Sequence, residues 1–328
     1  MKLRSFVVAA LALTLTAPVL AQDKDWPKHP IKIVGGFPGG AGTDIYARKL
    51  GEELSKVFGV PFVADNRTGA GGNVASDIVA RSDPDGYTFM LGTAGTHAIN
   101  ASLYKSLPFD VQKDFTRIAL LGDVPNVLLV NPEKHPDIKT CADLIALAKQ
   151  KPGQLNYSST GNGASGHLAG AQFTHLADID VVHVPYRGQG PAMTALLAGE
   201  VDFFFNQAAP SIGYINGGKV RALGVTLSKP IDALPGVDSV EKACNLPGYE
   251  SSTWYAIFAP ANLPREIQVR MNEEIAKIIK RPDFDKWLRD TQGITPPEDT
   301  SLEAFERIHK ADIERWAKIV EISGAKVD

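Results

Sequence analysis

The sequence predicts an α/β protein built from two lobes. Between residues 140 and 225, short apolar runs alternate with amphipathic runs of helical spacing, a pattern typical of mostly parallel sheets flanked by helices. Two further apolar runs, residues 126–130 and 254–260, enclose this region, so we expect two crossover strands that act as a hinge. The lobes are then expected to comprise residues 22–125 with 254–328 (lobe 1) and residues 126–253 (lobe 2).

In lobe 1, apolar runs predict three strands before the first crossing, separated by helical patterns. The first helix carries Tyr46, Leu50 and Leu54 at helical spacing, and Asn73 is placed to cap the second. After the chain returns, the tail is expected to be helical. The predicted elements are strands at 31–34, 61–64 and 87–91 and tail helices at 266–279 and 302–322.

In lobe 2, the residue pair Thr140 and Asp143 resembles a capping box and predicts a helix start. Another helix is opened by Gly190-Pro191, with proline at its first position, and closed by Gly199. The remaining predicted elements are strands at 126–130, 155–159, 181–184, 201–205 and 220–225 and helices at 166–176 and 210–215.

The first 21 residues have the pattern of a cleaved secretory signal. Lys2 and Arg4 precede a short apolar run, and small residues lead to an expected cleavage after Ala21. Without these two cations, 34 Lys and Arg become 32 against 37 Asp and Glu, a net charge of −5. An exported, mildly acidic chain without a basic tract is not expected to bind nucleic acid.

The chain has two cysteines, Cys141 and Cys244. They are too few for a disulfide scaffold. They could form one bridge in an oxidising compartment, but the sequence does not reveal the distance between them. No spacing of His, Cys or carboxylates suggests a metal site, and we expect neither a metal nor a cofactor.

The turn at residues 37–44 is the first candidate for a ligand site. It is rich in glycine and joins the first strand to the first helix. Glycines let a ligand approach the backbone closely, Thr43 can cap the helix, and a helix N-terminus favours an anion. A phosphate-binding loop would end in lysine, whereas this turn ends in Asp44, which would repel polyphosphate. We expect a small carboxylate here; the alternative is an ordinary turn that binds nothing.

Four more polar segments follow predicted strands: residues 93–97, 158–167 and 186–191, and Asn206. Open α/β sheets place ligands at such strand ends. The segments are rich in small hydrogen-bond donors, and none pairs an obvious nucleophile with a base. The sequence therefore favours binding over catalysis, and we expect no enzymatic activity. His97 could contact the ligand, although a lone histidine is more often structural.

Two motifs within residues 158–167 suggest alternatives. Residues 161–166 match the G-x-G-x-x-G dinucleotide fingerprint. The acid expected at the end of the next strand is replaced by Tyr186-Arg187. Arg187 could meet a 2′-phosphate, so an exported NADP-dependent oxidoreductase is one alternative. Ser165 narrowly misses a nucleophile elbow, because His167 replaces the last glycine, and a hydrolase is similarly disfavoured.

The chain also resembles a known family over nearly all of its mature length. Phe37-Pro38, Gly40, Thr43-Asp44 and Ala47-Arg48 are similar to the F-P-x-G-G-x-T-D-x-x-A-R segment of the tripartite tricarboxylate transporter receptors, also called the Bug family. Further matching segments are residues 65–67, 69–73, 85–87, 109–115, 152–157, 184–192 and 248–254.

This resemblance implies a monomeric periplasmic solute-binding protein with the two-lobed type II fold. Such receptors close on a small organic carboxylate and hand it to a membrane permease. The resemblance assigns the grip on one carboxylate to the turn at 37–44, the segment containing Ser158 and Ser165, and the loop at 186–191. A ligand-sensing subunit that signals to a sensor kinase is the alternative role.

Four departures from the family pattern bear on the ligand. Ala41 replaces a glycine and Gly36 a proline, while Arg187 stands where lysine is usual and Asn206 where aspartate is frequent. The last two would make the pocket more cationic and favour a second carboxylate. Aromatic residues near the site, Phe203–205 with Trp254 and Tyr255, suggest an aromatic dicarboxylate such as terephthalate, although a core role for each is the plainer reading.

The residues expected to contact the ligand are therefore the following: Phe37, Gly39, Gly40, Thr43, Asp44, Thr93, His97, Ser158, Thr160, Ser165, Arg187, Asn206 and Trp254.

Overall fold

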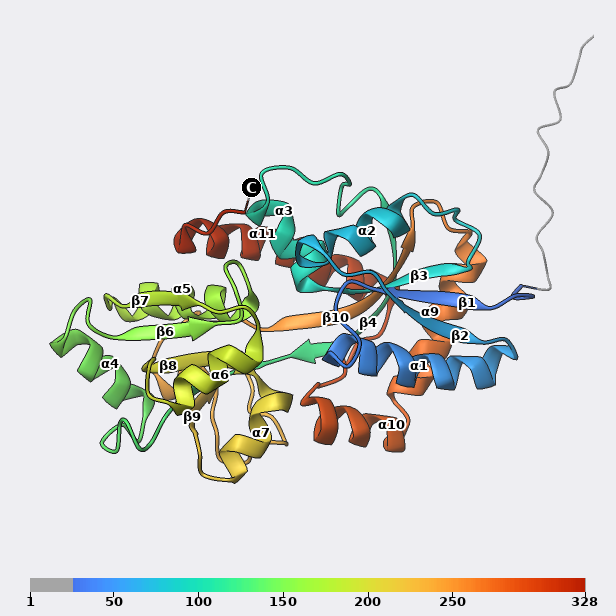
Figure 1. Ribbon diagram of the computed structural model, residues 1–328. Coiled ribbons are helices and arrows are strands. Elements are labelled where there is room, and N and C mark those ends of the chain that lie inside the picture. Colours follow the sequence, from blue (N-terminus) through green and yellow to red (C-terminus); the bar gives the residue numbers. More distant parts are fainter. Residues whose placement is uncertain (1–25, 328) are drawn as a thin grey trace, which may run out of the picture.

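The computed structural model describes residues 26–327 and shows two lobes, each built around a five-stranded sheet with helices on both faces (Figure 1). The predicted two-lobed α/β architecture is confirmed. The signal peptide expected over residues 1–21 lies outside the described residues. None of the helices between residues 26 and 327 is long and apolar enough to cross a membrane.

The sheet of lobe 1 has the strand order β2-β1-β3-β10-β4, in which β10 runs antiparallel to both neighbours. Alternate side chains face opposite layers: Phe89 and Leu91 pack on one side and Met90 on the other. The strands are β1 (Ile31–Gly35), β2 (Phe62–Asn66), β3 (Thr88–Thr93), β4 (Phe115–Val124) and β10 (Thr253–Pro260).

Two layers of helices cover this sheet. The first is formed by α1 (Gly42–Phe58), α9 (Arg265–Ile279) and α10 (Pro282–Trp287). The second is formed by α2 (Asn73–Ala80), α3 (Asn100–Leu103) and α11 (Leu302–Ser323). Shorter helical turns are η1 (Ala70–Gly72), η2 (Gly95–Ile99) and η3 (Leu288–Gln292).

The sheet of lobe 2 has the order β7-β6-β8-β5-β9, with β5 antiparallel to its two neighbours. Phe203 and Phe205 enter one core layer and Phe204 the other. The strands are β5 (Asn126–Val130), β6 (Asn156–Ser159), β7 (Val182–Pro185), β8 (Phe203–Gln207) and β9 (Arg221–Val225). The helices are α4 (Cys141–Gln150), α5 (Ser165–Ala177), α6 (Gln189–Leu197), α7 (Ala208–Asn216) and α8 (Val240–Ala243).

Each of the two expected crossover strands begins at a passage between the lobes. β5 starts directly after Pro125, and β10 starts directly after Ser252. The two passages lie side by side, because Thr253 Oγ1 donates to the Val124 carbonyl at 3.0 Å. Strand β4, which leads into the first passage, was not predicted. Its four consecutive apolar residues, 118–121, are flanked by Thr116-Arg117 and Gly122-Asp123.

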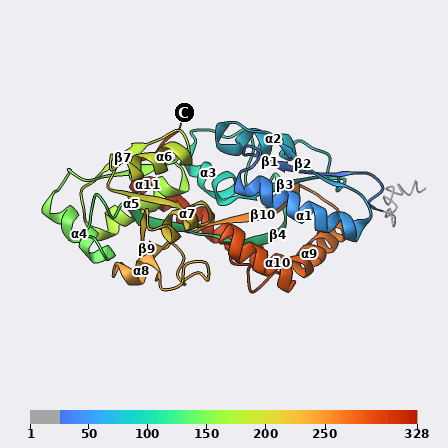
Figure 2. The ribbon, with the colours of Figure 1, turned by 60° about the horizontal axis from the view of Figure 1, so that its bottom comes forward.

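Helix α11 also connects the lobes (Figure 2). Leu168 of α5 packs into the α11 layer of lobe 1. Arg315 of α11 donates to the carbonyls of Glu250 and Ser252 at 2.8 and 3.1 Å, directly before the return passage. Helix α11 therefore contacts both lobes next to the return passage.

A disulfide joins Cys141 to Cys244, whose Cα atoms are 5.1 Å apart. It links the start of α4 to the end of α8 within lobe 2. The sequence left open whether the two cysteines are bridged, and the structure shows that they are. The predicted capping box is also present, since the side chains of Thr140 and Asp143 each accept the other's backbone N–H.

Candidate functional site

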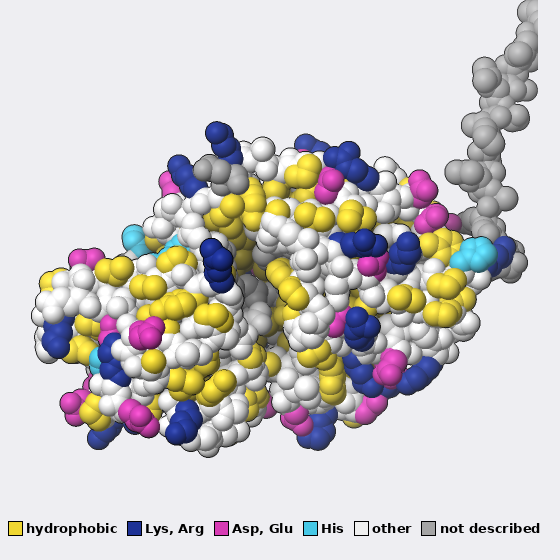
Figure 3. Space-filling view, in the orientation of Figure 1, with side chains coloured by type: hydrophobic (Ala, Val, Ile, Leu, Met, Phe, Trp, Pro, Cys, Tyr) yellow, Lys and Arg dark blue, Asp and Glu magenta, His cyan; other side chains and the backbone are white. Residues whose placement is uncertain are grey.

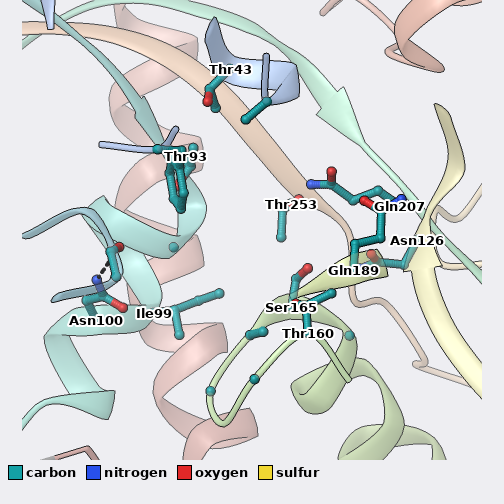
Figure 4. Close-up of a pocket in the computed structure, with 18 of the residues that line it drawn as sticks. Thr43, Thr93, Ile99, Asn100, Asn126, Thr160, Ser165, Gln189, Gln207 and Thr253 are labelled. Carbon is teal, nitrogen blue, oxygen red and sulfur yellow. Dashed lines mark hydrogen bonds between the residues drawn. The ribbon is translucent and has the colours of Figure 1, made fainter. Parts of the chain in front are cut away.

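A cavity of about 500 Å³ lies between the lobes, and a hollow is visible at their boundary in Figure 3. Its volume falls in the range of small-molecule sites. Figure 4 shows Thr43 and Thr93 of lobe 1 on one side and Thr160 and Ser165 of lobe 2 on the other. The strand ends of both sheets therefore converge on one cavity, as the sequence led us to expect.

Lobe 1 contributes the start of α1. Ala41, Gly42 and Thr43 line the cavity, and Ala41 is an N-cap residue with no side-chain hydrogen bond to the helix. Thr43 therefore does not cap the helix, contrary to expectation. An uncapped N-terminus keeps its first N–H groups available and carries a partial positive charge, which suits an anion.

Asp44 fastens the glycine turn and does not line the cavity. Its carboxylate accepts the N–H of Gly40 at 2.8 Å, the Asn66 amide at 2.7 Å and the Arg48 guanidinium at 3.0 Å. Burial by itself would raise the pKa of Asp44, but these hydrogen bonds outweigh it and lower the pKa to about 2. Gly40 has a φ of +82°, a left-handed backbone conformation that glycine adopts without steric cost.

Lobe 2 contributes the start of α5 and the loop before it. The N-cap, Ala164, also makes no side-chain cap. A Cβ on Gly166 would lie 2.2 Å from the Phe205 carbonyl oxygen, and one on Gly163 would lie 2.2 Å from Leu103 of lobe 1. Glycine at these two positions lets the loop pack against β8 and reach the opposite lobe.

The starts of α6 and α7 also reach the cavity. Gln189 is the first residue of α6, and Gln207 is the N-cap of α7. Both line the cavity, and neither helix has a side-chain cap. Helix N-termini from both lobes thus surround the same space, which favours negatively charged ligand groups.

No charged side chain lines the cavity among residues 26–327. Of the two positions behind the expectation of a more cationic pocket, Asn206 lines the cavity in place of an aspartate, whereas Arg187 adds no positive charge to the lining. The polar lining consists of hydroxyl groups, backbone groups and six carboxamides. These carboxamide residues are Asn100, Asn126, Asn162, Gln189, Asn206 and Gln207.

Asn126 lacks a partner for its side-chain donor. The residue is 1% exposed, and its Nδ2 has no hydrogen-bond partner in the described part of the chain. Figure 4 shows it beside Gln189 and Gln207 at one end of the cavity. A buried donor without an acceptor costs about 1–3 kcal/mol. A ligand oxygen at this end would supply the missing acceptor.

Six of the predicted contact residues line the cavity: Phe37, Thr43, Thr93, Thr160, Ser165 and Asn206. Seven do not. Gly39 and Gly40 lie in the turn before α1, and Asp44 lies in the first turn of that helix. Ser158 is fully buried, with an Oγ that has no partner among the described atoms. The remaining three are His97, Trp254 and Arg187.

His97 and Trp254 belong to the core of lobe 1. His97 is 0% exposed and stacks on Phe258 with ring centroids 3.9 Å apart. Burial holds its pKa well below the ordinary value, and its carbonyl accepts a bond from His309 at 2.7 Å. Trp254 is buried and donates through Nε1 to Asp312 at 2.6 Å. Both residues therefore have the structural role that the sequence analysis gave as the alternative to ligand contact.

Arg187 is exposed, and no ion-pair partner is found for it between residues 26 and 327. It lies at the rim, because the N–H of the next residue, Gly188, bonds to the carbonyl of Thr160 at 3.2 Å. Arg187 is therefore near the cavity but not part of its lining.

Sequence reasoning missed several lining residues, including Asn126, Gln189 and Gln207. Position could have indicated the two glutamines, because Gln189 begins α6 shortly after β7 and Gln207 ends β8 directly before α7. Asn126 gave a weaker signal: it is the one polar residue at the start of an otherwise apolar strand.

Comparisons with known proteins agree with this geometry. The family model of the tripartite tricarboxylate transporter family receptor matches residues 46–324. A Pseudomonas sp. protein from the tcbD–tcbE intergenic region is 35% identical over 97% of this chain and 94% of its own length. A Rhodopseudomonas palustris protein solved with adipate is 33% identical, with a TM-score of 0.82 over 92% of this chain and 100% of that chain. MatC from Rhodopseudomonas palustris, solved with malate, is 29% identical, with a TM-score of 0.76 over 90% and 100%.

Proposed function

Because the chain belongs to the tripartite tricarboxylate transporter receptor family, we propose that it captures a small organic dicarboxylate between its lobes in the periplasm. It then delivers this ligand to a permease of the tripartite tricarboxylate type. The observation that carries the proposal is an uncharged cavity surrounded by uncapped helix N-termini from both lobes.

Two carboxylates fit this arrangement better than one. Each helix N-terminus offers free N–H groups and roughly half a positive charge. The starts of α1 and α5 belong to opposite lobes, so a ligand with a carboxylate at each end would contact both. Such a ligand stabilises the approach of the lobes, because it contacts both helix N-termini at once only when the lobes are close. The adipate and malate bound by the two solved relatives are both dicarboxylates, which supports this class.

The group between the two carboxylates can be aliphatic or aromatic. Phe37, Phe205 and Tyr255 line the cavity, and aromatic side chains pack well against either an alkyl chain or a ring. Trp254 and the other two phenylalanines of β8 are buried in the cores and do not line it. The aromatic argument made from the sequence therefore rests on fewer rings than expected.

A binding panel tests the proposal. The mature chain is titrated by calorimetry with adipate, malate and terephthalate, and with hexanoate, which keeps the six-carbon chain of adipate but lacks its second carboxylate. We expect at least one dicarboxylate to bind, and hexanoate to bind at least tenfold more weakly than adipate. A dicarboxylate present at 100 times its Kd should also add about 2.7 kcal/mol of stability.

Two outcomes would contradict the proposal. Equal affinity for adipate and hexanoate would show that the second carboxylate is not recognised. Failure of every dicarboxylate to bind or to raise Tm would count against the ligand class itself.

A further inference from the structure

Two histidines of lobe 2 stack behind the loop that lines the cavity. We call residues 159–165 the ligand loop, because residues 160–165 all line the cavity. His167 lies in the first turn of α5, and His183 lies on β7. Their ring centroids are 3.8 Å apart, and the ring planes differ by 6°. Neither ring lines the cavity, so the proposed function does not use them directly.

Each ring holds one part of the ligand loop. His167 Nδ1 accepts the backbone N–H of Gly163 at 2.9 Å, and Gly163 has a φ of +74°. His183 Nε2 lies 2.7 Å from Ser159 Oγ. That hydroxyl in turn lies 3.0 Å from the Gly161 carbonyl oxygen and 3.2 Å from the Gly161 nitrogen. The two histidines therefore hold the beginning and the middle of the ligand loop from the side that faces away from the cavity.

The contact from His167 requires a neutral ring. Nδ1 can accept the Gly163 N–H only when it carries no proton. A cation at His167 would also face the positive end of α5 and would repel a second cation on His183. His167 is 5% exposed, and unpaired buried charge is costly.

Other titratable groups nearby do not offset this cost. Tyr157, His175 and Asp178 line a shallow cavity of about 390 Å³ beside the pair, and His175 and Asp178 are exposed. Burial lowers the pKa of His167 from 6.5 to about 4. Burial and then repulsion from His167 lower the pKa of His183 to about 3.

We propose that His167 and His183 are positioning residues that hold the ligand loop in its binding form, and that acidification opens the loop by protonating His167 at Nδ1. The effect on ligand release rests on the proposed function, whereas the effect on the loop does not. When the loop is open, His167 titrates near its ordinary value. For each unit that the pH falls between 6.5 and about 4, the ratio of open to closed loop therefore rises by up to tenfold.

The first experiment needs no ligand. Amide hydrogen exchange of Gly163 is measured by NMR at pH 7.5 and 5.0, corrected for the intrinsic pH dependence of exchange. His167→Phe keeps a stacked ring but has no acceptor, so we expect Gly163 to exchange at least tenfold faster at pH 7.5. His167→Asn places an acceptor near the position of Nδ1 and should restore protection at both pH values. In the wild type, protection should fall at least tenfold at pH 5.0.

His175→Ala is the matched control, because His175 lines the same shallow cavity and no hydrogen bond joins its side chain to the loop within residues 26–327. Its Gly163 protection should equal that of the wild type. If His167→Phe does not fold, His183→Phe, which removes the Ser159 contact, replaces it and should accelerate exchange of Gly161. Equal Gly163 protection in the wild type and His167→Phe would overturn the positioning role. Protection that does not change between pH 7.5 and 5.0 would overturn the acid opening.

The second experiment adds adipate as the probe. After correction for the protonation of adipate itself, wild-type affinity should fall at least tenfold from pH 7.5 to 5.0, and that of His167→Asn less than threefold. The same pH dependence in both proteins would overturn acid release through His167. An absence of adipate binding to the wild type at pH 7.5 would instead count against adipate as a ligand, and hydrogen exchange would still decide the role of the pair.

Discussion

The carboxylate of Asp44 accepts the backbone N–H of Gly40 at 2.8 Å and closes the glycine turn before α1. The same carboxylate holds the Asn66 amide of β2 at 2.7 Å. A residue expected to touch the ligand instead shapes the backbone that lines the cavity. This matters for function, because a ligand held by N–H groups depends on the accuracy of the backbone more than on any single side chain.

Replacing Asp44 should weaken both the fold and ligand binding. Asp44→Ala leaves the Gly40 N–H and the Asn66 amide without their acceptor, so we expect a loss of about 1–3 kcal/mol in unfolding free energy at pH 7. Adipate affinity should fall about tenfold. Urea unfolding and calorimetry measure the two effects. Asp77→Ala, which removes an exposed pair with Arg81, is the control and should cost less than about 1 kcal/mol.

The Asp44 effect has a defined pH dependence. Its pKa is lowered from 3.8 to about 2, so its contribution is fully present above pH 3.8 and is lost as the pH falls through 2. The stability difference between the wild type and Asp44→Ala should therefore shrink between pH 4 and 2. A constant difference over that range would contradict this assignment.

Asn126→Leu should separate stability from binding. Leucine has a similar shape and removes the buried Nδ2 that has no partner in the described structure, so unfolding free energy should stay the same or rise. Dicarboxylate affinity should fall by about 1–3 kcal/mol, since the donor at that end of the cavity is lost. Ser158→Ala is the control: Ser158 also has a buried side-chain group without a partner in the described structure, but it does not line the cavity. The dicarboxylate affinity of this variant should not change. Unchanged affinity of Asn126→Leu would exclude Asn126 from the site.

Arg187→Ala should have a small effect that depends on salt. The guanidinium is exposed at the rim, so it can attract a dianion but is screened by solvent and ions. We expect an affinity loss below about 1 kcal/mol, carried mainly by the association rate and diminished at high salt. Stopped-flow binding at two ionic strengths measures it. A salt-independent loss of about 2–5 kcal/mol would show instead that lobe closure brings Arg187 onto the ligand, as its family position implies.

The disulfide should stabilise lobe 2 without affecting recognition. Cys141 and Cys244 are separated by 103 residues, and closing a loop of that size typically contributes about 2–5 kcal/mol. The double variant Cys141→Ala/Cys244→Ala should lose that amount in urea unfolding. Its adipate affinity at 15 °C should match that of the wild type, because both cysteines lie in a core layer away from the cavity. An unchanged urea midpoint would contradict the prediction.

Much of the fold could be predicted because its signals are local. Short apolar runs predicted all five strands of lobe 2, and the pair Thr140 and Asp143 predicted the start of α4. The glycine turn before α1 and the loop before α5 were recognised as site loops because each follows a strand at the carboxyl edge of its own sheet, where open α/β sheets place ligands. Strand β4 was missed because its apolar run covers only residues 118–121 and is flanked by Thr116-Arg117 and Gly122-Asp123.

The sequence by itself determined the α/β class, most elements, the glycine loops and the family. Only the tertiary structure decided which of the expected contact residues meet. His97 follows the end of β3 and Trp254 lies at the start of β10, but both side chains turn into the core. Arg187 stays at the rim, and Asn126 enters the cavity because the chain crosses between lobes directly before it. The pairings of Cys141 with Cys244 and of His167 with His183 were equally hidden. Helices and turns arise from neighbours in the chain, whereas these contacts join separate elements that only the packed sheets bring together.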